Sequence, residues 1–351
     1  MATAVSATSR LQLALRTAAS SLLLAGSLLL LASTETPLNL VEPGPVTATA
    51  PVIEVSGPGV VSSPQSATTD GFHFLTIAFR PATVADLVAT IFDPYSYVAP
   101  PDAFAFPGES PADAAARQRH MMEQSQFAAT YAALYTAGVV DLPPVVVASV
   151  DPAGPSAGAL MEGDVVLAVN GPPTPTPASV AEVVSALKPG TKAAFEVLRD
   201  GDPVSVEVDT AADFAAPDVA RAGIVVAAPP PAELPYEVVF LLDGVGGPSA
   251  GLMFALEILD RLDPADLLGG RVVVGTGAIR PNGEVEPIGG VSQKIAAAVE
   301  LDPDVILVPE ANYDEALATV ESLGFDSSRL HAVATLAGAR DLLAAKASSA
   351  G

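Results

Sequence analysis

Short apolar runs that alternate with helical patterns fill the last third of this chain and limit its fold most strongly. Strand-like runs stand at 237–242, 271–279 and 305–309. Helices are expected at 249–262, 292–300, 313–323 and 336–346. Because strands separated by helices usually form a sheet covered by those helices, residues 232–346 are expected to form an α/β domain.

The region before this domain has shorter strands and more frequent turns. Apolar runs at 145–150 and 165–171 predict strands, and residues 178–187 predict an amphipathic helix. A hairpin is expected to follow in AAFEVLRDG and VSVEV. This order of elements, together with the stretch GALMEGDVVLAVNG, resembles a PDZ domain over residues 139–210. The resemblance implies that an extended peptide or protein segment binds there as an added strand.

Other parts of the chain are expected to connect or support these two domains. Residues 37–70 are rich in Pro, Ser, Thr and Val and predict a stalk, with one strand near 52–55. Residues 71–138 combine a strand at 72–79 with a long helical pattern. Residues 211–231 are rich in Ala and Pro and predict a connector.

An apolar segment lies near the N-terminus. Residues 17–33 contain no charged side chain, and Arg10 and Arg16 precede them. A membrane-spanning helix needs about 20 residues, and the leucines before Arg16 extend the run toward that length. We therefore expect residues 1–36 to form an uncleaved single-pass anchor in the cell membrane, with the bulk of the chain on the extracytoplasmic side. A cleaved signal peptide is the alternative, although no clear cleavage site follows the leucines.

Composition excludes several classes of function. The formal net charge is −24, which disfavours nucleic acid as a partner because nucleic acid binds basic surfaces. The chain has no cysteine, so disulfides and thiolate chemistry are excluded. Its three histidines, His73, His120 and His331, do not stand at ligand spacing. We therefore expect neither a metal site nor a cofactor.

The pentapeptide Gly-Pro-Ser-Ala-Gly occurs twice in the chain. At Gly247-Pro248-Ser249-Ala250-Gly251 it joins a strand to a helix, where small neighbours expose the hydroxyl and backbone N–H groups can stabilise an oxyanion. Ser249 is therefore a candidate nucleophile, and Gly247, Pro248 and Gly251 are candidate turn or oxyanion residues. In the PDZ-like region the same pentapeptide surrounds Ser156, where a tight turn alone explains its small residues.

Lys294 is the candidate general base for Ser249. The chain has four lysines, of which Lys294 alone lies in the body of the α/β domain. It follows Pro287-Ile288-Gly289-Gly290, whose glycines allow close approach of the backbone before a helix starts. Burial depresses the pKa of a lysine, and the neutral amine can then accept the proton of a serine hydroxyl.

Three segments of the α/β domain resemble the proteolytic domain of the Lon protease family. They are VGGPSAGLMFALEI, VVVGTGAI and GEVEPIGGVSQKIAAA, in that order. The resemblance implies a serine endopeptidase with a Ser249–Lys294 dyad, in which Thr276 hydrogen-bonds the lysine. The whole chain resembles bacterial membrane-anchored proteins that join a PDZ domain to such a protease domain. The expected fold class is thus an α/β (α+β) proteolytic domain and a small β-rich PDZ domain behind an N-terminal transmembrane helix.

This chain departs from the family pattern at two positions. Gly246 stands where cytoplasmic Lon enzymes carry Asp, and Ala278 stands where they carry Glu. The chain also has no Gly-x-x-x-x-Gly-Lys-[Ser/Thr] motif, so we expect proteolysis without ATP. Lon-type domains often form rings, so whether this chain forms a homo-oligomer stays an open question.

The resemblance also extends to the chain's first half. The strand at 72–79 and the helix around Glu123-Gln124-Ser125-Gln126 resemble the start of a Lon proteolytic domain. That interpretation makes 71–138 the first half of the protease domain, with the PDZ domain inserted into it. The alternative is an unrelated helical spacer.

Two other functions compete with a Ser–Lys protease. Gly-Pro-Ser-Ala-Gly also fits the nucleophile motif of α/β-hydrolases, with His331 as the base, but that fold needs more strands before its serine. A non-catalytic membrane-tethered PDZ scaffold is the other alternative, favoured by Gly246 and Ala278.

Overall fold

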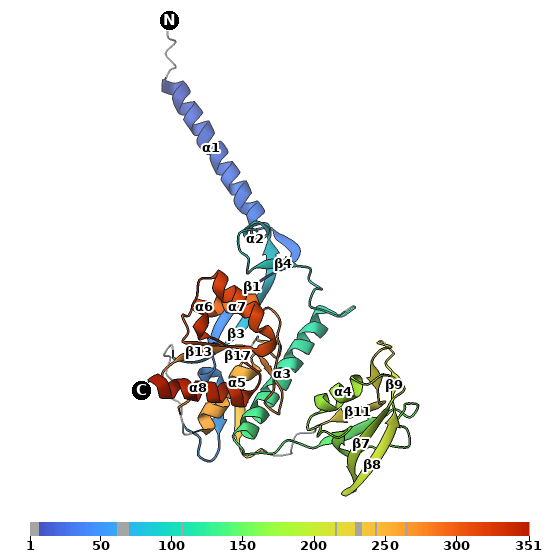
Figure 1. Ribbon diagram of the computed structural model, residues 1–351. Helices are drawn as coiled ribbons and strands as arrows, with labels where there is room; N and C mark the ends of the chain where they lie inside the picture. The colour runs from blue at the N-terminus through green and yellow to red at the C-terminus, as the bar shows by residue number, and fades with distance from the viewer. Residues whose placement is uncertain are drawn as a thin grey trace. The chain divides into compact units, whose positions relative to one another are not determined.

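The computed structural model describes residues 7–61, 70–106, 108–214, 216–228, 234–242, 244–263 and 266–350 (Figure 1). The chain divides into two compact units. Unit 1 comprises Met1–Ala133 and Val238–Gly351, and unit 2 comprises Leu134–Glu237. The sequence of unit 2 thus lies between the two parts of unit 1.

A six-stranded sheet forms the centre of unit 1, in the order β17-β16-β13-β3-β1-β4. Its strands are β1 (Glu35–Ala48), β3 (Gly71–Thr83), β4 (Tyr97–Ala99), β13 (Val272–Gly275), β16 (Val305–Pro309) and β17 (Leu330–Val333). Four strands of this sheet, β3, β13, β16 and β17, are parallel to one another. Strand β1 is antiparallel to β3 and to β4. Shorter strands pair beside this sheet: β2 (Ile53–Ser56) with β12 (Glu237–Phe240), and β14 (Ala278–Ile279) with β15 (Val285–Glu286).

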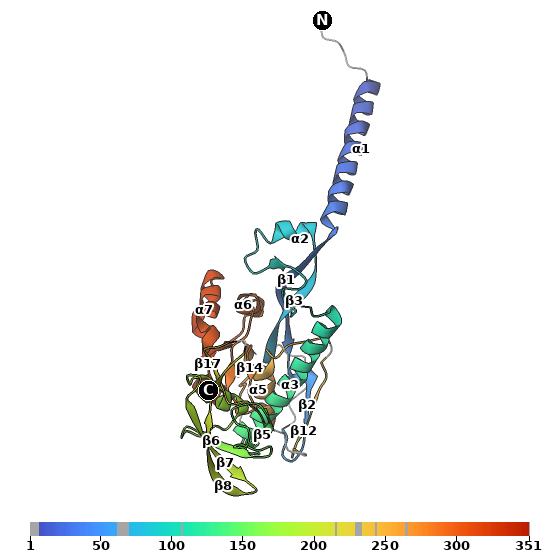
Figure 2. The same cartoon turned by 90° about the vertical axis from the view of Figure 1, so that its right-hand side faces the viewer.

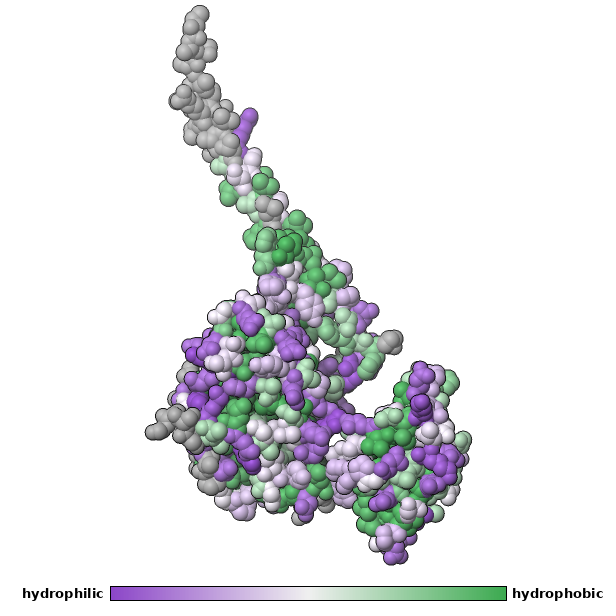
Figure 3. Space-filling model, in the orientation of Figure 1, coloured by the Kyte–Doolittle hydropathy of each residue, from purple (hydrophilic) through white to green (hydrophobic). Residues whose placement is uncertain are grey.

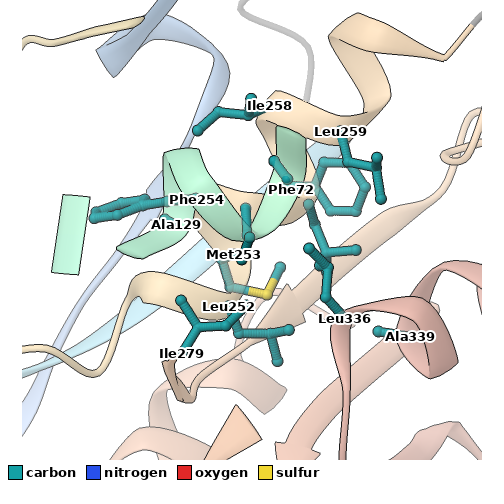
Figure 4. Close-up of a cluster of buried hydrophobic side chains, with 14 of the residues drawn as sticks. Phe72, Ala129, Leu252, Met253, Phe254, Ile258, Leu259, Ile279, Leu336 and Ala339 are labelled. Carbon is teal, nitrogen blue, oxygen red and sulfur yellow. The ribbon is translucent and has the colours of Figure 1, made fainter. Parts of the chain in front are cut away.

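Helices cover both faces of the sheet because the buried strands are apolar on both sides. Along β16, Val305 and Leu307 face one core, whereas Ile306 and Val308 face the other. The first core also contains α3 (Pro111–Thr136), α5 (Gly251–Leu262) and α8 (Leu336–Ala350), and Figure 4 shows its centre. The second core contains α6 (Val291–Val299) and α7 (Tyr313–Ser322). Three 3-10 turns complete the unit: Ala50–Val52, Glu310–Asn312 and Ser327–Arg329.

The segment expected as a stalk, 37–70, is instead largely part of unit 1. Its first third lies in β1, which pairs with β3 along most of its length, and Leu40 and Val41 are buried. The prolines of this segment suggested an extended linker, but Pro43 occurs beside an irregularity in the strand register, where a missing N–H is tolerated. Residues 62–69 of the expected stalk lie outside the described part of the chain.

Helix α1 (Ala7–Ala32) precedes β1. Helix α2 (Val84–Ala89) follows β3 and begins beside the end of α1 (Figures 1 and 2). The N–H of Val84 donates to the carbonyl of Thr34 at 3.0 Å, which ties the two segments together. The side chains described at Leu22, Leu29 and Leu30 are exposed. Among the described residues, none of the helices has the length and apolar character that crossing a membrane requires.

Unit 2 is a small β-rich fold. Its sheet has the order β11-β5-β6-β7-β8. The strands are β5 (Val145–Val150), β6 (Val165–Val169), β7 (Lys192–Arg199), β8 (Asp202–Asp209) and β11 (Ile224–Ala227), and β9 (Ala211–Ala212) pairs with β10 (Ala220–Arg221). Helix α4 (Pro177–Ser185) packs Val180 and Val184 into the apolar core around Phe195. Thr176 caps this helix by accepting the N–H of Ser179, as its sequence pattern favours.

The segment expected as a connector, 211–231, is also partly structured. Strand β11 lies within it and pairs antiparallel with β5, so this segment completes the sheet of unit 2. Four consecutive apolar residues, IVVA, supply that strand, and the surrounding Ala and Pro residues obscure it in the sequence. Residues 229–231 lie outside the described part of the chain.

Candidate active site

Ser249 lies in the turn that enters α5. The backbone of Gly247 has φ +82°, a left-handed conformation that glycine adopts without strain. Gly251 begins the helix, where a Cβ atom would lie 2.9 Å from Ile279 Cγ2 and from Ser125 Oγ. Only a glycine therefore fits at that position. Ser249 itself is half-buried, and its hydroxyl has no hydrogen-bond partner within the part of the chain that the structure describes.

The segment after β13 holds the backbone of Ser249 in place. The Ser249 carbonyl accepts the hydroxyl of Thr276 at 3.0 Å and the N–H of Gly277 at 2.8 Å. The Gly277 carbonyl in turn accepts the N–H of Leu252 at 3.0 Å. Gly275 allows this approach, because a Cβ atom there would lie 2.6 Å from Met253 Sδ. Three hydrogen bonds thus fix the turn around Ser249 and the start of α5 to the segment after β13.

Lys294 enters the same network from α6. Gly290, with φ +68°, precedes the helix, and the side chain of Lys294 is 2% exposed. Its Nζ donates to Thr276 Oγ1 at 3.2 Å. The Thr276 hydroxyl therefore accepts from Lys294 and donates to the carbonyl of Ser249. The structure brings all three predicted residues into one network, with Thr276 as the link.

Burial lowers the pKa of Lys294 to about 8, from 10.5. Desolvation is the cause, because removing an ammonium group from water disfavours its charged form. At neutral pH the ammonium form still predominates, but the uncharged fraction of the amine is far larger than for an ordinary lysine. A neutral amine can donate one N–H to Thr276 while its lone pair stays available as a proton acceptor.

Helix α3 also contacts the turn around Ser249. Ser125 is buried, and its hydroxyl donates to the Pro248 carbonyl at 3.0 Å. The Gln118 carbonyl accepts the N–H of Gly247 at 3.2 Å. From the sequence, Ser125 is only one member of a helix that resembles the start of a Lon domain. Gln118 carries no sequence signal at all, because its contact is made by a backbone carbonyl.

Gly247, Pro248 and Gly251 shape the turn, but none presents a free N–H to an oxyanion in this conformation. The N–H of Gly247 is bonded to Gln118, and that of Gly251 donates to the Pro248 carbonyl at 3.2 Å. Proline has no N–H. All three residues lie in the turn, and the two N–H groups are engaged within the protein; a role for these residues at an oxyanion stays a prediction.

One of the two departures from the family pattern, Gly246, has a local explanation in the packing. A Cβ atom at Gly246 would lie 3.0 Å from Cβ of Gln118, so an aspartate there would crowd α3. Ala278 is buried in β14, opposite Glu286. Neither position belongs to the hydrogen-bond network of Thr276.

Other candidate residues lie apart from this network. His331 is on the edge strand β17, where its Nε2 is buried and has no partner among the described residues. Ser156, in unit 2, is fully buried and donates to the Ala222 carbonyl at 2.6 Å. Within the described residues, no group of three or more His, Cys, Asp or Glu side chains could hold a metal ion.

Comparison with known proteins identifies two domain families in this chain. Residues 123–210 match the model of the PDZ domain family, and residues 244–336 match that of the Lon protease (S16) C-terminal proteolytic domain. The second match includes Ser249, Thr276 and Lys294.

Individual relatives match over short stretches. An archaeal Lon protease from Archaeoglobus fulgidus is 34% identical over 84 residues, which are 23% of this chain and 13% of that protein. A probable periplasmic serine endoprotease, DegP-like, from Pseudomonas fluorescens is 45% identical over 67 residues, which are 19% of this chain and 14% of that protein. This chain thus spans less than a sixth of the length of either relative.

A solved structure also matches, the PDZ domain of the SdrC-like protein from Listeria monocytogenes. It is 19% identical and covers 25% of this chain and 92% of that one, with a TM-score of 0.23. The assignment of the two domains rests on the family models and not on this solved structure. The chain therefore carries a PDZ domain and a Lon-type (S16) proteolytic domain, and the latter belongs to a family of serine proteases.

Proposed function

We propose that this chain is a serine endopeptidase that works without ATP, with Ser249 as its nucleophile and Lys294 as its general base. One observation carries the proposal: a single buried hydroxyl, that of Thr276, bonds both the Lys294 amine and the Ser249 carbonyl. A solvated helix lysine has no reason to point into such a network. Desolvation also gives Lys294 a pKa of about 8, which suits a base near neutral pH.

The chemistry follows from these positions. The neutral amine of Lys294 takes the proton of the Ser249 hydroxyl as Oγ attacks the carbonyl carbon of the scissile peptide bond. The resulting ammonium gives its proton to the leaving amine when the C–N bond breaks, which leaves an acyl-enzyme on Ser249. Water then attacks the ester, with Lys294 again accepting a proton, and the free serine is restored. Thr276 keeps the amine oriented through both steps.

The PDZ domain supplies a separate place for substrates to bind. PDZ domains bind peptides by adding them as a strand to a sheet edge. We infer that unit 2 recognises peptide or protein substrates in this way and delivers them to the protease unit. Its position in the sequence, between the two parts of unit 1, supports this, because both ends of unit 2 are tied to the protease unit.

We further propose that α1 attaches the protein to the cell membrane, with the remainder of the chain outside the cytoplasm. The described leucines of α1 support attachment, because they are exposed and would otherwise face water. Carbonate extraction of membranes should leave the protein in the membrane fraction, and external protease should degrade its body in cells whose membrane is intact. Release by carbonate, or protection from external protease, would contradict this part of the proposal.

Labelling with a serine-directed fluorophosphonate tests the catalytic proposal directly. We expect an adduct on the wild-type protein, and none on Ser249→Ala or Lys294→Ala. Ser156→Ala is a matched control, because the same pentapeptide surrounds both serines, and it should still be labelled. His331→Ala should also be labelled, whereas an α/β-hydrolase with His331 as its base would lose the adduct.

A non-catalytic PDZ scaffold is the second candidate function. The engaged N–H groups of Gly247 and Gly251 favour it, because they leave the turn without those donors for an oxyanion. Under this alternative the wild-type protein would remain unlabelled while its circular dichroism shows an intact fold. It would still bind peptides through unit 2.

A further inference from the structure

An exposed apolar tip lies at the end of α2. It consists of Val88, Ile91 and Phe92, whose side chains are 55%, 74% and 82% exposed. Apolar residues on a surface are often scattered singly. These three instead stand within five consecutive positions, at the end of α2 and just after it. Their exposure to water is unfavourable, so a binding partner for this tip is expected.

The backbone N–H groups at this tip require no water. The N–H groups of Thr90, Ile91, Phe92 and Asp93 donate to carbonyls of the preceding turn, at 3.0, 3.3, 2.9 and 3.2 Å. A segment can enter an apolar medium only if such groups are satisfied internally, since each unpaired one costs several kcal/mol there. The tip meets that requirement for all four donors.

The acidic groups beside the tip are also engaged. Asp93 accepts the N–H of Tyr95 at 2.9 Å and the hydroxyl of Ser96. Asp86 accepts both terminal nitrogens of Arg80, at 2.7 and 2.8 Å, so its charge is paired. Both carboxylates are thus held by hydrogen bonds within unit 1. The tip is thus apolar at its surface although the chain as a whole is acidic.

Helix α2, which carries the tip, begins beside the end of α1. Val84, at the start of α2, is hydrogen-bonded to Thr34, two residues after α1 ends, and the two helices are in contact. The last turns of α1 expose Leu29, Leu30 and Leu31. In Figure 3 the hydrophobic surface continues from the lower part of α1 onto the base where α2 lies. A surface that receives α1 therefore meets α2 at the same level.

We propose that this tip inserts into the interfacial layer of a lipid bilayer and fixes the protease unit against the membrane surface. The inference rests on the proposed membrane attachment through α1 and goes beyond it by assigning a second contact. Apolar burial drives the contact, because the net charge of −24 repels anionic lipid. Zwitterionic lipid should therefore suffice, and added anionic lipid should not strengthen the contact.

Single tryptophans can test this, because the chain has none of its own. Three full-length variants are reconstituted with phosphatidylcholine vesicles that carry bromine on the upper acyl chain. Phe92→Trp reports on the tip, Leu30→Trp on α1, and Phe214→Trp on a residue of unit 2 that is 99% exposed. We expect bromine to quench Phe92→Trp and Leu30→Trp by about twofold, and to leave Phe214→Trp unchanged.

The outcomes separate this inference from the membrane attachment on which it rests. Quenching of Leu30→Trp without quenching of Phe92→Trp would overturn the inserted tip and leave the attachment intact. Quenching of neither would overturn both. A blue-shifted but unquenched Phe92→Trp would mean that protein, rather than lipid, covers the tip, and that would also overturn the inference.

Discussion

The two copies of Gly-Pro-Ser-Ala-Gly place their serines in opposite situations. Ser156 is completely buried, and its hydroxyl donates to the carbonyl of Ala222 within unit 2. Ser249 is half-buried. Its carbonyl accepts a hydrogen bond from Thr276, whereas its hydroxyl has no partner among the described residues. A satisfied hydroxyl stabilises a fold, whereas a serine hydroxyl without a partner stays available for reaction when a base can reach it.

The glycines of the two copies show how one sequence gives two turns. In unit 2 the last glycine, Gly158, is left-handed with φ +78°, and the chain turns away after it. In unit 1 the first glycine, Gly247, is left-handed with φ +82°, and the last one, Gly251, begins α5. The pentapeptide permits both conformations. The surroundings of each copy select one of the two conformations. In unit 2 the copy is hydrogen-bonded to Ala222, and in unit 1 it is hydrogen-bonded to Thr276-Gly277.

The largest expected effect is on catalysis at the two serines. Ser249→Ala removes the proposed nucleophile and should lower kcat/KM for a peptide substrate by at least about 10³-fold. Ser156→Ala should leave kcat/KM unchanged, because its hydroxyl serves only the packing of unit 2. Initial rates on an unstructured protein substrate would measure both. A similar loss in the two variants would remove the distinction between the copies.

Replacing the base should separate activity from stability. Lys294→Met removes the proton acceptor, so activity should fall by at least about 10³-fold. The buried amine has a pKa of about 8 when folded, below its ordinary 10.5, so keeping it protonated in the folded state costs free energy below pH 8. Lys294→Met should therefore increase the free energy of unfolding at pH 7 by about 1–3 kcal/mol.

This stability difference should depend on pH. Between pH 8 and 10.5 the folded wild type loses the proton while the unfolded chain keeps it, so wild-type stability rises with pH in that window. The advantage of Lys294→Met should consequently shrink from pH 7 to pH 10. Urea unfolding of unit 1, followed by hydrogen exchange of α6, would measure it. A gap independent of pH would mean that Lys294 is not desolvated.

Removing the linking hydroxyl should have a smaller effect. Thr276→Val keeps the side-chain shape but removes one hydrogen bond to Lys294 and one to Ser249, so kcat/KM should fall by about 10- to 100-fold. The acid limb of the pH–rate profile should lie near pH 8 in the wild type and move lower in the variant. The reason is that the threonine oxygen, as an acceptor, favours the ammonium form.

Thr174→Val provides the matched control. Thr174 is also a buried threonine, and its hydroxyl has no partner among the described residues. Its replacement should alter neither the rate nor the pH profile. An unchanged pH profile in Thr276→Val would show that the hydroxyl does not contact the working base.

Much of the fold was open to prediction because its strands and helices differ in period. The strand at 305–309 and the helices of the last domain follow from apolar patterns. The structure places their ends within two residues of expectation, except that α8 extends four residues further, to Ala350. Strands β1 and β11 were not predicted, because both lie in proline- or alanine-rich segments and their stability comes from pairing with β3 and β5. Pairing of that kind is a tertiary property.

The site was predictable to the extent that side chains carry it. Ser249 and Lys294 could be selected from the sequence, since a second copy of the motif and the scarcity of lysine allowed comparison within the chain itself. The contribution of α3 was less accessible. Its contact with Gly247 uses the backbone carbonyl of Gln118, and no residue type specifies such a contact.

The smallest expected effect concerns the stability of unit 2 and completes the comparison. Ser156→Ala deletes a buried hydrogen bond and leaves the carbonyl of Ala222 without that donor, which should destabilise unit 2 by about 1–2 kcal/mol. Since Ala222 lies two residues before β11 begins, amide exchange in β11 and β5 should accelerate by about tenfold, with no change in α5. Ser249→Ala should show neither effect. If it instead accelerated exchange in α5 by a similar factor, its hydroxyl would be a structural group like that of Ser156, and the contrast between the two copies would fail.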